Sequence, residues 1–170
     1  MEALLSRFLG HYPSHLQESV RQRLEAGTLG EYVQGKYPTH HSVKDDKALF
    51  GYVNALKQRH LKKFPPLSKV VYDTKIDVVK NALGIHRFVS RVQGGKLKAK
   101  NEVYIASVFK HAPEAFLEMI VVHELAHFKS KEHDKAFYQF CAHLLPSYHQ
   151  VEFDFRVWLV VRAVEKKEGI

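Results

Sequence analysis

The sequence has a single cysteine, Cys141, so the chain can form no internal disulfide. This cysteine lies among apolar residues of a helical pattern, which is typical of a buried and unreactive thiol. A chain without disulfides suits a reducing compartment, and we expect a cytoplasmic protein. The first residues also lack the apolar core and the small-residue cleavage site of a signal peptide.

Long apolar runs are absent as well. Charged residues interrupt each run well short of the roughly 18 residues that a membrane-spanning helix needs, so we expect no membrane contact. Internal repeats, low-complexity segments and linkers rich in glycine or serine are also missing. A chain of 170 residues therefore fits one domain, 1–170. Its net charge of +8 favours anionic partners without saying which.

The expected elements come in the order helices, a small sheet, and helices again. Residues 1–66 are mainly helical, with apolar residues at four-residue spacing and with glycine or proline where helices end. The part from 67 to 170 begins with three segments rich in β-branched and aromatic residues, at 68–76, 86–92 and 102–109. Helical patterns follow from about 113, 133 and 148. Because strands and helices do not alternate, the order predicts an α+β fold.

The segment HELAH places His123 and His127 four residues apart in a strongly apolar helical pattern. Residues i and i+4 of a helix share one face, so both imidazoles can reach one ion. Glu124 lies about 100° further round the helix, where its carboxylate can take a proton from a water held by that ion. The motif predicts a zinc-dependent hydrolase centre in which Glu124 activates this water. Two exposed histidines on an amphipathic helix are the alternative interpretation.

A zinc centre of this type needs a third protein ligand, and His133 is the natural candidate. Ten residues of unbroken helix rise about 15 Å, so His133 reaches the ion only if the chain turns back after His127. The polar residues between these two histidines predict that turn. His133 would then open the next helix, and Glu132 or Asp134 could orient a ligand from outside the first shell of contacts. We expect one zinc ion held by the three histidines.

The stretch HELAHFKSKEHDKAF, residues 123–137, resembles the motif of the YgjP-like family of zincin-fold metal hydrolases, which are related to SprT-like and WLM metallopeptidases. The shared pattern is HELAH, five residues, a histidine and then a phenylalanine one turn later. The resemblance covers most of residues 30–160 and is weakest in the first 25. It implies a zincin-like fold with strand 102–109 beside the active-site helix. It also implies a zinc-binding set and a catalytic residue: His123, His127 and His133, with Glu124 as acid and base.

The family is classed with metallopeptidases by its motif, while its members are also named as pyrophosphatases that act on UTP. A peptidase aligns its substrate along an exposed sheet edge, which strand 102–109 could provide, although a strand with only internal partners explains the same pattern at least as well. It also needs a group that stabilises the oxyanion, and Tyr138, one turn beyond His133, is a candidate. A metallopeptidase acting on a peptide substrate is the first interpretation of the sequence.

A nucleotide pyrophosphatase would instead need cations around the phosphates. The hairpin at 87–100 is rich in basic residues, and Arg91 is the best single candidate for a phosphate clamp. Lys96 and Lys98 alternate along one strand and would share a face. A solvated hairpin whose lysines discourage edge pairing explains the same charges. Pyrophosphatases also more often use magnesium held by carboxylates, which counts against this second interpretation.

A third interpretation is a non-catalytic zinc module associated with nucleic acid. Basic residues also cluster at 57–64, near the end of an expected helix. No recognisable nucleic-acid-binding motif accompanies them, and a basic helix end is usually only solvated. Nucleic acid is therefore the weakest of the three candidate partners.

Overall fold

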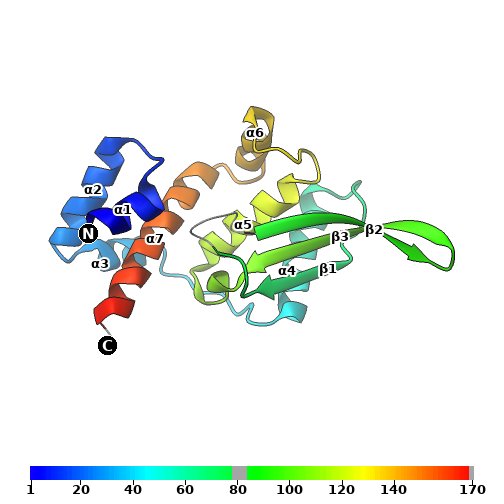
Figure 1. Ribbon diagram of the computed structural model, residues 1–170, viewed down its shortest axis with the longest axis horizontal. Coiled ribbons are helices and arrows are strands. Elements are labelled where there is room, and N and C mark those ends of the chain that lie inside the picture. Colours follow the sequence, from blue (N-terminus) through cyan, green and yellow to red (C-terminus); the bar gives the residue numbers. More distant parts are fainter. Residues whose placement is uncertain (78–83, 169–170) are drawn as a thin grey trace. The chain divides into compact units, whose positions relative to one another are not determined.

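The computed structural model describes residues 1–77 and 84–168, with the backbone alone at 89–93, 97–98 and 167–168 (Figure 1). The chain forms two compact units, one made of residues 1–39 and 149–170 and the other of residues 40–148. Helix α4 (Asp46–His60), which lies in the part expected to be mainly helical at 1–66, thus groups with the sheet. The prediction of a single domain over 1–170 stays a prediction.

The first unit is helical, and a buried carboxylate ties two of its helices together. Asp154 is 2% exposed, and its carboxylate lies 2.7 Å from the Lys36 ammonium and accepts a hydrogen bond from the Tyr37 hydroxyl. Within residues 1–77 and 84–168, no helix combines the length and the hydrophobicity that crossing a bilayer requires. The helices of this unit are α1 (Glu2–Leu9), α2 (Ser14–Glu25), α3 (Leu29–Lys36) and α7 (Tyr148–Glu168) beyond its first residue.

The second unit is built on a three-stranded sheet of order β1-β3-β2. The central strand pairs in parallel with β1 and antiparallel with β2. Gly94 and Gly95 connect β2 to β3 with φ of 56° and 74°, the left-handed values that a tight hairpin turn requires. Figure 1 shows the tip of this hairpin projecting past the end of β1. The strands are β1 (Lys69–Asp73), β2 (Gly84–Gln93) and β3 (Lys96–Ala106).

The strand that could have offered an exposed edge to a peptide is the central one of the sheet. Residues 102–106 belong to β3, which has a partner on each side, and the chain continues into the short 3-10 helix η1 (Ser107–His111). The strand with an open side next to the helix carrying HELAH is β2. Of the two interpretations of strand 102–109, an exposed edge and a strand with internal partners, the structure supports the second, and a local pattern could not decide between them because sheet order depends on long-range pairing.

Helix α5 (Glu114–Ala126) is buried along most of its length, which explains why its sequence is apolar on nearly every side. Phe116 and Ile120 are both 0% exposed. The helix contacts β2, and α4 (Asp46–His60) contacts both α5 and β1. After α5 the chain turns into α6 (Lys135–Leu144). The expected mixture of helices around a small sheet is confirmed, and it brings the end of α5 next to the start of β2.

Candidate metal centre and active site

Three imidazole nitrogens converge at the end of α5. The Nε2 atom of His133 lies 3.1 Å from Nε2 of His123 and 3.1 Å from Nε2 of His127. Nitrogens bound at ~2.0–2.1 Å to one tetrahedral zinc ion lie about 3.3 Å apart. The three nitrogens are thus spaced as the ligands of one ion. Among the described residues, these histidines are the group whose ligand atoms lie close enough together to hold a metal ion.

The convergence depends on a reversal of the chain directly after α5. His127 is the C-cap of this helix, and the amides of Lys129 and Ser130 both donate to the Ala126 carbonyl, at 3.0 and 3.2 Å. These bonds close the end of the helix and turn the chain back. The next helix begins after Asp134, whose side chain accepts a 2.8 Å hydrogen bond from the Phe137 amide as an N-cap.

The hydrogen bond of His127 fixes which of its ring nitrogens can bind a metal. Its Nδ1 lies 2.9 Å from the Ser130 carbonyl oxygen, which can only accept, so Nδ1 carries the proton. The lone pair of the neutral ring then lies on Nε2, the atom that faces the other two histidines. Burial also lowers the pKa of His127, which favours the neutral form that binds zinc.

Tyr148 holds His123 in the corresponding way. Its hydroxyl lies 2.7 Å from Nδ1 of His123, and its side chain is buried, with 1% exposed. With Nε2 of His123 facing the other histidines, Nδ1–H donates to the Tyr148 oxygen. The Tyr148 hydroxyl also bonds to the thiol of Cys141, whose pKa burial raises to about 12. The hydrogen bonds that orient His127 and His123 therefore come from Ser130 and Tyr148. Asp134, one of the two residues expected to orient a ligand, instead caps α6.

Glu124 is buried beside the three nitrogens. Its side chain is 1% exposed, its Oε1 lies 4.0 Å from Nε2 of His123, and neither carboxylate oxygen has a hydrogen-bond partner among the described residues. Burial raises the pKa of Glu124 to about 8. A buried carboxylate without partners is unfavourable unless a ligand, an ion or water completes it, so its placement fits a metal site with a catalytic base.

Gly84, the first residue of β2, makes room for this carboxylate. A Cβ atom there would lie 2.7 Å from Glu124 Oε1 and 2.9 Å from the carbonyl oxygen of Tyr104. Both distances are shorter than van der Waals contact, so any side chain at this position would displace the carboxylate or the strand. The start of β2 therefore lies directly against the Glu124 carboxylate, and only glycine fits there.

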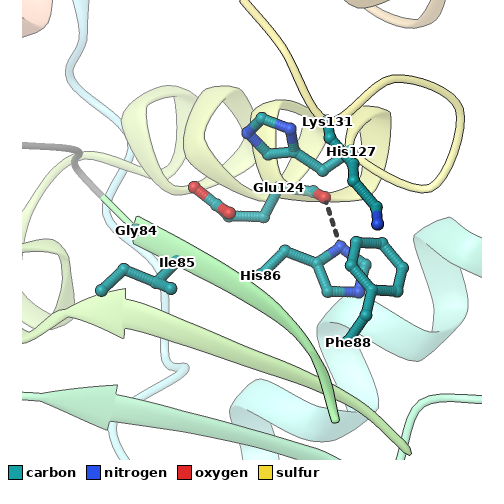
Figure 2. A pocket seen from close by; sticks show the side chains of 7 residues that line it. All are labelled: Gly84, Ile85, His86, Phe88, Glu124, His127 and Lys131. Atoms are coloured by element: carbon teal, nitrogen blue, oxygen red, sulfur yellow. Dashed lines mark hydrogen bonds between the residues drawn. The ribbon is translucent and has the colours of Figure 1, made fainter. Parts of the chain in front are cut away.

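An open pocket of about 360 Å³ lies between β2 and the end of α5. Figure 2 shows the Glu124 carboxylate between the helix and the start of β2, next to Gly84. The imidazole of His127 lines the same pocket, and Lys131 of the α5–α6 loop stands at its other side. The remaining lining residues, all from β2, are Ile85, His86 and Phe88.

His86 joins the two walls of this pocket. Its Nδ1 donates to the main-chain oxygen of Glu124 at 3.0 Å, and its ring stacks on Phe88 with centroids 4.4 Å apart. Burial lowers the pKa of His86 to about 4, so the ring is neutral at physiological pH. His86 is 37 residues before His123 in the sequence, and no motif spacing links it to the three histidines.

The model of the family described as "YgjP-like, metallopeptidase domain" matches residues 11–156. This chain belongs to the YgjP-like family. It is 56% identical over 152 residues to the protein named UTP pyrophosphatase of Escherichia coli (strain K12). The aligned region covers 89% of this chain and 91% of that protein. No solved structure matched the chain. The expected family is confirmed, and the YgjP-like domain agrees with a zincin-like arrangement of helices and sheet.

The geometry of this YgjP-like protein fits a metal held by His123, His127 and His133. A zinc ion there supplies a Lewis acid that polarises the substrate and lowers the pKa of water. The carboxylate of Glu124 lies where it can accept a proton from an attacking water and return that proton to a leaving group. The metal-dependent hydrolase expected from the sequence is supported at this level.

The expected substrate-binding residues are only partly brought to the pocket. Tyr138 is half-buried, with its ring centroid 6.3 Å from that of His133, so it lies beside the metal centre. Lys96 pairs with Gln93 at the tip of the hairpin. Gln93 is nine residues after Gly84 in β2, so the two residues lie about 30 Å apart along the strand. Lys96 is therefore remote from the pocket of the YgjP-like centre.

Arg91 and Lys98 are two further residues that were expected to bind phosphate. The backbones of Arg91 and Lys98 pair with each other in the β2–β3 ladder, and their side chains lie outside the described residues. The basic residue that does line the pocket is Lys131. Lys131 lies between His127 and His133 in the sequence. The polar residues of this segment predict a turn, and their pattern does not indicate a role in the pocket.

Replacing Tyr148 by phenylalanine is expected to weaken zinc binding by roughly ten- to a hundredfold, the usual effect of removing an outer partner of a metal-bound histidine. The ring and its packing remain, but Nδ1–H of His123 loses its acceptor. Zinc affinity is measured by competition with a chelator, together with thermal unfolding of the metal-free protein. Tyr138→Phe, which removes a hydroxyl near His133, is the matched control, and equal affinities in the two variants would refute the role of Tyr148.

Proposed function

We propose that this YgjP-like protein is a zinc-dependent hydrolase that converts nucleoside triphosphates, UTP in particular, to the monophosphate and pyrophosphate. The observation that supports this most directly is the pocket in which Glu124, a metal-binding histidine and the cation Lys131 line one space. The relative that is 56% identical carries the name UTP pyrophosphatase, and this name supports proposing a nucleotide before a peptide as the substrate.

In the proposed reaction, a water oxygen forms a new bond to the α-phosphorus while the bond from that phosphorus to the bridging oxygen of the β-phosphate breaks. Glu124 takes the proton of the attacking water on a carboxylate oxygen and delivers it to the departing pyrophosphate. The ammonium of Lys131 offsets the negative charge of the phosphate chain. Arg91, Lys96 and Lys98 stay in the proposal only as distant contributors to a positive field that attracts the nucleotide.

The test is a direct comparison of substrates. Zinc-loaded protein is incubated with UTP, with each of the other three nucleoside triphosphates and with an unfolded peptide mixture. UMP and pyrophosphate in equal amounts, separated by anion-exchange chromatography, are the expected products. Orthophosphate and UDP would place the cleaved bond elsewhere and contradict the proposed reaction. Inertness toward all the nucleotides would refute it.

A metallopeptidase is the second candidate, and one observation favours it. Strand β2 is one of the two edge strands of the sheet, and its first residue lies against the Glu124 carboxylate, so a peptide added along β2 would pass the three histidines. Tyr138 remains the proposed oxyanion partner in this case. New peptide termini, found by mass spectrometry and lost with Glu124→Gln, would support this function over the nucleotide.

Two weaker expectations stay proposals. A cytoplasmic location is supported by the buried free thiol of Cys141 and can be tested by fractionation of cells. A nucleic-acid-associated role rests on the net positive charge and on the basic residues at 57–64. Binding that is independent of sequence and disappears at moderate salt would be the ordinary behaviour of a basic surface.

A further inference from the structure

Phe88 has an unusual position for a large apolar side chain. It is 44% exposed, and it lines the same pocket as Glu124 and His127. Single exposed apolar residues are common on protein surfaces, so exposure by itself means little. The position matters more, because this ring faces the space where a substrate of the metal centre must lie.

The ring of Phe88 is also held firmly from behind. One side stacks on His86, at 4.4 Å between centroids and 23° between planes, and Phe128 meets it edge-on at 6.0 Å. His86 is in turn fixed to the catalytic helix by its bond to the main chain of Glu124. An aromatic ring supported on one side and exposed on the other is the arrangement that proteins use to stack bases.

We propose that Phe88 is the platform on which the base of the nucleotide stacks. This inference rests on the proposed pyrophosphatase function and adds to it the group that holds the nucleoside end. Gly84, next to the Glu124 carboxylate, and Phe88 are four residues apart in β2, a distance of about 13 Å. The pocket thus has a reacting end and an aromatic end, as a substrate with a phosphate chain and a base requires.

Lys131 fits this orientation. Its ammonium lies 5.4 Å from the centroid of the Phe88 ring, so a positive charge lies at the aromatic end of the pocket that Glu124 and His127 also line. A bound base would share the face of Phe88 with this flexible side chain, whose ammonium can move toward the phosphates. Because every base has an aromatic face, stacking supplies affinity for nucleotides in general and leaves the preference for uracil to other contacts.

The experiment compares UTP with methyl triphosphate, which has the same phosphate chain but neither base nor ribose. Phe88→Leu keeps an apolar side chain and removes the aromatic face, while Phe88→Trp keeps an aromatic face. In Phe88→Leu, kcat/KM for UTP is expected to fall by roughly 5- to 150-fold, equivalent to about 1–3 kcal/mol, with methyl triphosphate unchanged. Phe88→Trp is expected to hydrolyse UTP within about threefold of the native rate.

Tyr32→Leu is the control, since Tyr32 is an exposed aromatic residue of α3, 37% exposed, in the other compact unit. A loss for both substrates in Phe88→Leu, or for neither, would overturn the stacking role while leaving the pyrophosphatase function in place. Absence of hydrolysis of both substrates by the native protein would overturn the proposed function itself. Cleavage of peptides that depends on Phe88, with UTP untouched, would make the pocket a site for an apolar peptide side chain.

Discussion

Replacing Glu124 by glutamine lowers kcat for UTP by about 10²–10⁴-fold while the protein still binds equimolar zinc, if the carboxylate is the base of the reaction. Glutamine has the same size and shape, and the carboxylate has no hydrogen-bond partner among the described residues that the amide would lose. The three Nε2 atoms are unchanged, so zinc should stay bound. Initial rates of pyrophosphate release and elemental analysis of dialysed protein measure the two quantities.

Glu132→Gln is the matched control for this variant. Glu132 is exposed in the α5–α6 loop, and its substitution makes the same change of carboxyl to amide in the same histidine motif. Gly84→Ala gives a second route to the same loss, because its Cβ would lie 2.7 Å from Glu124 Oε1 and displace the carboxylate without removing it. A native rate in Glu124→Gln would exclude the residue as the base, whatever the metal content.

The cluster of three histidines could be predicted from the sequence because its members are close together along the chain. His123 and His127 are one helical turn apart, and His133 follows after a turn that the polar residues indicate. Only the reversal after His127 had to be assumed, and the structure places it directly at the C-cap of α5. Short spacing within one segment determines geometry to within a few ångströms, which is enough to bring three nitrogens together.

The walls of the pocket could not be predicted in this way. His86 and Phe88 reach the catalytic helix only because β2 is the outer strand on that side of the sheet, and sheet order is set by long-range pairing. Tyr148 is 25 residues from His123 along the chain, with no periodic relation to it. The lysines of the hairpin led to the prediction of a phosphate site there. Lys96 instead lies at the projecting tip of the hairpin, away from the pocket.

The loss of His133 is expected to have the largest effect on the metal. His133→Ala removes one of the three nitrogens, and the loss of zinc affinity should exceed the roughly ten- to hundredfold effect expected for the outer partner Tyr148. Because His133 is exposed, the alanine variant should fold as stably as the metal-free native protein.

Chelation distinguishes this loss of ligand from a loss of fold. Zinc at a hundred times its Kd stabilises the folded state by about 2.7 kcal/mol, so a chelator should lower the Tm of the native protein and leave that of His133→Ala unchanged. His143→Ala, at an exposed histidine of α6, should respond to the chelator as the native protein does. Native zinc stoichiometry in His133→Ala after dialysis would remove His133 from the ligand set. The ion would then need another third ligand, and Glu124, the buried carboxylate nearest the remaining histidines, would become a ligand in place of the base.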